Sequence, residues 1–243
     1  MSIRHRIGLM VPSTNTTCEG DYQLVAPKSM TVHGQRLWLT NDSMGEEGME
    51  RMNTDIESGA RYLSTARVDA IVYACTTGSF FKGAGWDRDM LDLIERTAKV
   101  PAIGTSPAVV EALRFMGARK ISVATPYPDW SNRRLRTYLE TAGFTVLNVE
   151  GEPVAVGAGQ QGINDQDPES VVRFASQACR PEADLLFCSC TAWRSLEVVE
   201  DLERITGRPV VTSNQSTIWA SFRKLGLTGP IEGYGSLLRR MDH

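Results

Sequence analysis

Two short apolar runs, each leading into a polar turn, dominate the hydrophobic pattern of this chain. The run at 68–74 is too short to span a membrane and contains Ile, Val and Tyr, which predicts a buried strand. The run at 183–188 predicts a second buried strand of the same kind. The turns that follow them hold Cys75, Thr76, Thr77 and Ser79 in the first case and Ser189, Cys190 and Thr191 in the second. Such turns combine a thiol with hydroxyls and backbone N–H groups, which suits an anion beside a nucleophile.

The two runs belong to a longer repeat. Apolar runs at 7–12 and 121–126 both end in proline. Cys75 follows Pro12 by 63 positions, and Cys190 follows Pro126 by 64 positions. A third matched pair follows the cysteines, at 101–117 and 209–226. Three pairs in the same order and at nearly equal spacing predict two copies of one α/β unit, with one cysteine in each.

The remaining pattern divides the chain into elements around these pairs. Apolar positions three or four apart from Met49 to Leu63 predict one amphipathic helix over 44–66. Further strands are expected at 30–40, 100–104 and 144–149, and further helices at 87–97, 106–117, 129–142 and 169–179. The glycine-rich segment 151–168 is predicted to be a loop, and it is interpreted as a mobile cover or a connection between lobes. The boundary falls at 116–119 without a flexible linker, giving lobes at 1–117 and 118–243, and it stays open whether the C-terminal segment packs back on the first lobe.

Composition narrows the class of protein. The 243 residues suffice for two lobes with their own cores, and 42% hydrophobic with 23% charged residues is ordinary for a globular protein. A net charge of −3 offers no basic surface for nucleic acid or anionic lipid. No apolar run approaches the length of a membrane span or of a signal-peptide core, so we expect a cytoplasmic protein. Five cysteines without framework spacing are expected to be reduced.

Several familiar kinds of site do not fit the sequence. The three histidines, His5, His33 and His243, have no ligand-like spacing, and Cys188 and Cys190 do not form a C-x-x-C pair, so no metal site is predicted. A G-x-G-x-x-G pattern occurs at 157–162, but Asp165 and Pro168 intervene before any helix, which argues against a dinucleotide site.

Cysteine paired with cysteine remains as the candidate chemistry. A thiolate is both a nucleophile and a base, and nearby N–H groups lower the pKa of a thiol. Two thiols across a cleft can move protons on opposite faces of a carbon, or one can add covalently while the other handles the proton. The hydroxyls and N–H groups of the turns would hold a carboxylate and stabilise an enediolate. Against this, buried cysteines often serve only as small hydrophobic residues. We expect that role for Cys18 and Cys179, and for Cys188, which should point into the core and away from Cys190.

At the level of motifs the sequence resembles a known family. The segments VPSTNTT, ACTTGS, ATPYPDWSN, SCTA and PVVTSNQ, in this order over nearly the whole chain, resemble the maleate cis-trans isomerase and arylmalonate decarboxylase branch of the aspartate/glutamate racemase superfamily. The resemblance implies an α/β fold of two pseudo-symmetric Rossmann-like lobes, each a mainly parallel sheet flanked by helices, with the active site in the cleft between them. It also implies that no cofactor is used and that the protein is a homodimer or a higher homo-oligomer.

The resemblance also assigns roles to residues. Cys75 matches the nucleophile that adds to an alkene carbon of maleate, and Cys190 matches the second cysteine, a proton donor and acceptor. The positions that match substrate-binding residues are Asn15, Tyr127, Asn164, Thr76, Thr77 and Thr191.

Two departures from the family pattern limit the expected activity. Decarboxylases of this branch have glycine where Cys75 stands, which argues against that activity here. The polar turn Thr-Thr-Gly-Ser replaces the aliphatic run of the isomerases and is similar to the racemases. We expect a cofactor-independent isomerase of a small mono- or dicarboxylate, converting maleate to fumarate. The alternatives are a racemase of an amino acid or other α-substituted acid, and a non-catalytic protein that binds small carboxylates.

Overall fold

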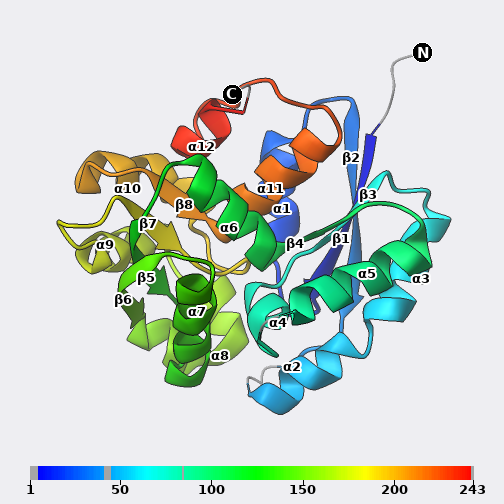
Figure 1. The fold of residues 1–243 in the computed structure, drawn as a ribbon, viewed down its shortest axis with the longest axis horizontal. Coiled ribbons are helices and arrows are strands. Elements are labelled where there is room, and N and C mark those ends of the chain that lie inside the picture. Colours follow the sequence, from blue (N-terminus) through cyan, green and yellow to red (C-terminus); the bar gives the residue numbers. More distant parts are fainter. Residues whose placement is uncertain (1–4, 41–44, 84, 242–243) are drawn as a thin grey trace.

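Two parallel four-stranded sheets form the framework of the molecule (Figure 1). The computed structural model describes residues 5–40, 45–83 and 85–241. The first sheet has the order β2-β1-β3-β4, and the second has the equivalent order β6-β5-β7-β8. Their strands are β1 (His5–Pro12), β2 (Met30–Leu37), β3 (Ala70–Tyr73), β4 (Ala102–Gly104), β5 (Lys120–Thr125), β6 (Thr145–Gly151), β7 (Leu185–Cys188) and β8 (Val210–Thr212). The same strand order in both halves confirms the predicted repeat of one α/β unit.

Helices cover the two sheets and meet between them (Figure 1). Those of the first half are α1 (Cys18–Val25), α2 (Glu46–Asn53), α3 (Ile56–Thr65), α4 (Thr76–Phe80), α5 (Trp86–Ala98) and α6 (Thr105–Phe115). Those of the second half are α7 (Asp129–Thr141), α8 (Pro153–Asn164), α9 (Pro168–Ala178), α10 (Val199–Thr206), α11 (Ser213–Lys224) and α12 (Gly235–Arg239), with a 3₁₀ turn at Leu196–Val198. Helices α6 and α11, which occupy equivalent places in the repeat, pack against each other. None of the helices in the described ranges combines the length and apolarity that crossing a membrane requires.

The predicted helix over 44–66 is wrong in one respect. Two helices, α2 and α3, occupy this segment, with a break at Thr54 and Asp55; residue 44 itself lies outside the described residues. The Asp55 carboxylate accepts the backbone N–H of Trp38 at 2.8 Å and a hydrogen bond from the Arg51 guanidinium at 2.8 Å. An Asp side chain readily forms hydrogen bonds to nearby groups and to backbone N–H groups distant in the sequence, in place of helical bonds. The helix is therefore interrupted here although the apolar spacing continues.

The segment 151–168 is not the loop that its glycines suggested. It contains helix α8, which begins with Pro153 at its first turn and is capped by the Glu152 side chain, an acceptor for Ala155 N–H at 2.6 Å. Gly159, with φ 71° and ψ −163°, interrupts the helical geometry inside it. Ala155 and Ile163 are buried, and their burial stabilises a helix that composition alone does not favour.

A shared core joins the two halves. Buried side chains of β1 and β3, such as Leu9 and Val72, belong to one apolar cluster with those of β5 and β7, such as Val123 and Phe187. Helix α11 of the second half also contacts α1, where the hydroxyls of Tyr22 and Ser221 lie 3.1 Å apart. We propose the division into lobes at 117/118, because one complete sheet lies on each side of that point.

Candidate active site

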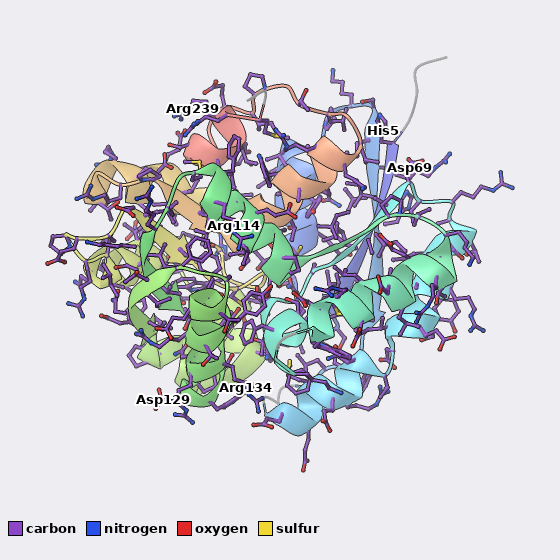
Figure 2. The ribbon with its side chains drawn as sticks, in the orientation of Figure 1. His5, Asp69, Arg114, Asp129, Arg134 and Arg239 are labelled. Atoms are coloured by element: carbon purple, nitrogen blue, oxygen red, sulfur yellow. The ribbon has the colours of Figure 1, made fainter. Side chains whose placement is uncertain are left out.

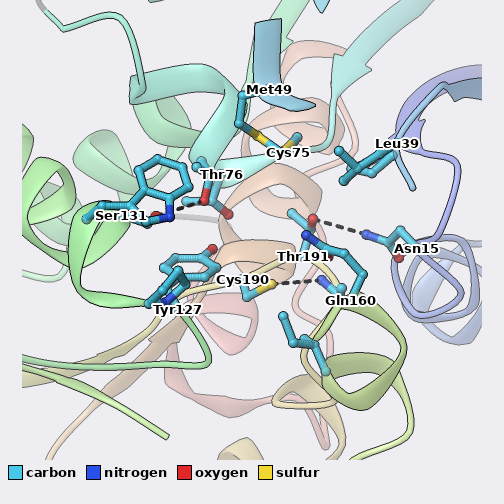
Figure 3. Close-up of a pocket in the computed structure, with 16 residues that line it drawn as sticks. Asn15, Leu39, Met49, Cys75, Thr76, Tyr127, Ser131, Gln160, Cys190 and Thr191 are labelled. Atoms are coloured by element: carbon cyan, nitrogen blue, oxygen red, sulfur yellow. Dashed lines mark hydrogen bonds between the residues drawn. The ribbon is translucent and has the colours of Figure 1, made fainter. Parts of the chain in front are cut away.

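A small cavity of about 40 Å³ lies between the lobes, where the carboxyl ends of strands from both sheets converge (Figure 3). In Figure 3 the Cys75 side chain lies above this cavity and that of Cys190 lies below it. The cavity lining includes seven of the eight predicted site residues: Asn15, Cys75, Thr76, Thr77, Tyr127, Cys190 and Thr191. A water position needs about 10–15 Å³ on this measure, so the cavity suits a molecule of few atoms.

Cys75 caps the first turn of α4. It stands two residues beyond the end of β3 in extended geometry, with φ −142° and ψ 110°, and its sulfur accepts the N–H of Gly78 at 3.3 Å. Burial raises the pKa of the Cys75 thiol to about 12, although the Gly78 N–H opposes that shift, and the nearby Cys190 raises it further.

Cys190 stands two residues beyond the end of β7, in the position equivalent to Cys75. Its sulfur accepts the N–H of Ala192 at 3.4 Å. Burial raises the pKa of the Cys190 thiol to about 11, while hydrogen bonds from Ala192 N–H, the Tyr127 hydroxyl and Trp193 N–H lower it in part. The N–H groups lower the thiol pKa values, as expected, but burial outweighs them at both cysteines. Burial thus favours the protonated form of both thiols at neutral pH.

Asn15 links the two lobes at the cavity. Its amide nitrogen donates to the hydroxyl of Thr191 at 3.1 Å, and that hydroxyl donates to the carbonyl of Ala74 at 3.0 Å. Its amide oxygen accepts the backbone N–H groups of Thr17 and Cys18, both at 3.0 Å. These bonds set the orientation of the amide, so its nitrogen points toward the second lobe.

The hydroxyls near Cys75 also have partners in the second lobe. Thr76 donates to the Ser213 hydroxyl at 3.0 Å, and the hydroxyls of Thr77 and Ser131 lie 3.2 Å apart. Tyr127 is buried, and its pKa is raised well above the usual value because its hydroxyl lies away from solvent and near Cys190. It therefore remains a hydrogen-bond donor at any physiological pH.

Asn164 is the one predicted site residue that does not line the cavity. Its amide oxygen accepts Thr16 N–H at 3.0 Å and the Thr17 hydroxyl at 3.4 Å. Its amide nitrogen donates to the carbonyls of Thr14 and Gln160, both at 2.9 Å. Two donors and two acceptor sites are thus engaged, which fills the capacity of the amide. Asn164 ties α8 to the loop that carries Asn15, and direct contact with a substrate stays a prediction.

Sequence reasoning missed several residues of the cavity. Ser131 and Trp130 lie within the ATPYPDWSN segment, whose motif could have indicated them, whereas Gln160 and Ile163 come from the unexpected helix α8. Leu39 and Met49 also line the cavity with apolar side chains. The sequence did not indicate that they belong to the site, because they reach the cavity only through the packing of the first lobe.

The other cysteines lie away from the cavity. Cys18 and Cys188 are fully buried, as predicted, and Cys179 is partly buried on the surface of the second lobe. Strand alternation does not relate Cys188 to Cys190, because β7 ends at Cys188 and Cys190 has a φ of 149°. All five cysteines are free thiols.

The cavity lining carries no charged side chain in the part of the chain that the structure describes. Figure 2 shows Arg114 and Arg239, both of which are exposed, on the outside of the molecule. Groups of acidic, histidine and cysteine side chains that could hold a metal ion are also absent from the described ranges. An anion in the cavity would be held by amide, hydroxyl and backbone N–H donors, with two thiols beside it.

Comparison with known proteins agrees with this arrangement. The sequence model of the arylmalonate decarboxylase family matches residues 7–238. The chain belongs to this family. The resemblance inferred from the motifs is thereby confirmed.

The family contains relatives of nearly the same length. A maleate isomerase from Pseudomonas putida is 28% identical over an alignment of 251 positions that covers 98% of each chain. A solved structure of a Pseudomonas putida maleate isomerase variant with maleate has a TM-score of 0.89 at 25% identity, covering 97% of this chain and 98% of that one. A Nocardia farcinica maleate cis-trans isomerase variant with a covalently bound succinylcysteine intermediate has a TM-score of 0.89 at 26% identity, with the same coverage. These likenesses confirm the predicted fold of two similar α/β lobes.

Proposed function

We propose that this protein is a cofactor-independent isomerase that uses Cys75 and Cys190 on a small carboxylic acid, converting maleate to fumarate. The observation that carries the proposal is that both thiols, one from each lobe, line a single small cavity with uncharged hydrogen-bond donors. The full-length likeness to maleate isomerases supports maleate as the substrate.

The reaction begins when the thiol pair loses one proton to solvent and the remaining proton resides on Cys190, which leaves Cys75 as the thiolate. The Cys75 thiolate then adds to one alkene carbon and forms a C–S bond, while the electron pair of the double bond moves to the other carbon and its carboxylate. The Cys190 thiol gives its proton to that carbon, which leaves a succinyl group on Cys75 and a thiolate at Cys190. The former double bond is now single and can rotate. Cys190 removes a proton again and the C–S bond breaks, which releases fumarate and restores the Cys75 thiolate.

Neutral donors would stabilise the charge that moves during these steps. Asn15 donates one amide proton to Thr191 and has a second for a carboxylate oxygen. We propose the same carboxylate-binding role for Tyr127, Thr76, Thr77 and Thr191, whose hydroxyls or N–H groups lie at the cavity. Because the site is buried and preorganised, such donors are more effective than they would be in water.

A racemase is the second candidate function. The geometry that favours it is the same pair of thiols, because two acid–base groups from different lobes can serve opposite faces of one carbon. The polar turn after Cys75 is similar to that of racemases. This alternative predicts exchange of an α-proton with solvent and no covalent adduct.

The free cysteines bear on the cell compartment of the protein. Five free cysteines, two of them at the cavity, remain reduced most readily in the cytoplasm. We propose a cytoplasmic homodimer or higher homo-oligomer.

One experiment separates these functions. Maleate and a panel of α-substituted acids are incubated with the protein in deuterium oxide and followed by proton NMR, with intact-protein mass spectrometry in parallel. The isomerase predicts fumarate and, in Cys190→Ser, a succinyl adduct on Cys75. Deuterium incorporation at an α-carbon without an adduct would favour the racemase. Ligand binding that survives in both Cys75→Ala and Cys190→Ala, with no turnover of any acid by the wild type, would favour a binding protein.

A further inference from the structure

The backbone of Cys190 is in an unusual conformation. Its φ of 149° lies in the region that favours glycine, and within the described ranges it is one of three non-glycine residues with positive φ. Cys75, at the equivalent place in the first lobe, has an ordinary extended φ of −142°. The two halves therefore differ in backbone conformation at the two cysteines of the cavity, and a contact is needed to hold Cys190 in its less favoured conformation.

The hydroxyl of Ser213, the first residue of α11, binds the backbone of Cys190. Its oxygen accepts the backbone N–H of Cys190 at 3.0 Å. The same oxygen accepts the hydroxyl of Thr76, the residue next to Cys75, also at 3.0 Å. Ser213 is fully buried, so neither bond competes with water. One hydroxyl thus connects the turns that carry both thiols, although Ser213 itself is not part of the cavity lining.

The conformation of this turn decides what faces the Cys190 sulfur. Beyond Cys190 the chain presents the N–H of Ala192 to the sulfur at 3.4 Å, and the N–H of Trp193 also lowers its pKa. Both donors depend on the path of the chain at Cys190. If the Cys190 N–H lost its acceptor, the backbone could relax to a more common φ and turn those donors away.

We propose that Ser213 is a positioning residue that holds the Cys190 turn in its reactive geometry and sets its place relative to the Cys75 turn. For catalysis this inference rests on the proposed two-thiol reaction. Its physical content concerns the reactivity of Cys190, which can be measured without any substrate.

The test compares Ser213→Ala with Ser213→Thr and with the matched control Ser216→Ala. Ser216 is equally buried on α11, but its hydroxyl donates to the Thr212 carbonyl at 2.8 Å and touches neither turn. Thr is the conservative variant because Thr105 occupies the equivalent place in the first lobe, at the start of α6. Each cysteine is alkylated with iodoacetamide from pH 7 to 10, and the rates are read separately by peptide mass spectrometry.

We expect Ser213→Ala to slow alkylation of Cys190 about tenfold at pH 8 and to shift the pH dependence of that rate to higher pH. The loss of one hydrogen bond changes an equilibrium constant by about a factor of ten. Alkylation of Cys75 should stay within about threefold of wild type, because its Gly78 donor is local. Ser213→Thr should restore the rate at Cys190, and Ser216→Ala should leave it unchanged. With maleate, kcat should fall in Ser213→Ala while KM changes little.

Unchanged alkylation of Cys190 in Ser213→Ala would overturn the proposal, and so would an equal loss in Ser216→Ala. If Ser213→Ala does not fold, Ser213→Cys keeps the size with a poor acceptor and must show the same slowing at Cys190. The labelling distinguishes the two proposals. Slowed alkylation of Cys190 in Ser213→Ala, together with no turnover of maleate by the wild type, would contradict only the proposed function. Normal alkylation and normal turnover in Ser213→Ala would contradict only the role of Ser213.

Discussion

The amide of Asn15 in the first lobe donates a hydrogen bond of 3.1 Å to the hydroxyl of Thr191 in the second lobe. These two residues are 176 positions apart in the chain and follow strands of different sheets. Their contact shows how the cavity is built: each lobe supplies hydrogen-bond donors and one thiol, and polar bonds cross between the lobes.

Asn15→Asp should separate substrate binding from folding. Asp keeps an oxygen that can accept the N–H groups of Thr17 and Cys18, but it loses the amide protons and adds a negative charge beside a carboxylate. We expect thermal unfolding within a few degrees of wild type and a rise in KM for maleate of at least about a hundredfold, the cost of a like charge in a buried site. Steady-state kinetics and a melting curve check this. A near-normal KM would show that Asn15 does not bind the carboxylate.

The rate should rise with pH. The pair must lose one proton before Cys75 can attack, and burial holds the pKa values of Cys190 and Cys75 at about 11 and about 12. Because both are raised, the reactive thiolate is scarce at pH 7 and becomes common only as the pH approaches the lower value. We expect kcat/KM for maleate to increase about tenfold per pH unit between pH 7 and 9. A flat profile over that range would mean that one cysteine is already ionised at rest.

Asp21 should make folding less favourable as the pH rises. Burial raises its pKa to about 7, although a hydrogen bond from the Asn214 amide at 2.6 Å opposes the shift. The folded state therefore keeps a proton that the unfolded chain loses near its ordinary pKa of about 4, so stability falls between about pH 4 and 7 and stays low above it. Asp21→Asn removes this titration and keeps an acceptor for Asn214. We expect it to stabilise the protein by about 2–3 kcal/mol more at pH 8 than at pH 5.

Urea unfolding at the two pH values measures the effect of Asp21→Asn. Asp184→Asn is a useful comparison, because Asp184 is exposed and the backbone N–H groups of Lys120 and Arg119 lower its pKa. Its change should not grow between pH 5 and 8, since that carboxylate is already ionised in both states. An equal response of the two variants to pH would contradict the assignment to Asp21.

Asn164 should act through the loop that carries Asn15. Asn164→Ala removes the bonds to Thr14, Thr16 and Thr17, and we expect KM for maleate to rise about tenfold, as the loop loses its support. A double-mutant cycle with Asn15→Ala decides between the two roles. Strong non-additivity is expected if Asn164 works through Asn15, whereas additive losses would indicate separate contacts with the substrate.

Local patterns predicted most of the framework correctly. The runs before Cys75 and Cys190 are buried strands because their apolar residues are consecutive, as a sheet covered on both faces requires. The break between α2 and α3 was not predicted, since it depends on a bond from Trp38 N–H to Asp55, residues that meet only in the folded chain. Helix α8 was missed for a related reason: its glycines weaken helix propensity, and the burial of Ile163 that stabilises it is tertiary.

The duplicated order of strand, cysteine and threonine is a property of the sequence itself, and it was enough to predict two like lobes, a thiol in each and a family, because repetition and periodicity are local. Only the tertiary structure decided that the Asn164 amide bonds to a loop, that Ser213 bonds to both cysteine turns, and that burial raises the pKa of both thiols. Those outcomes depend on which atoms meet across the lobes and on how deeply they are buried. Neither the contacts nor the burial can be predicted from the local sequence around a residue.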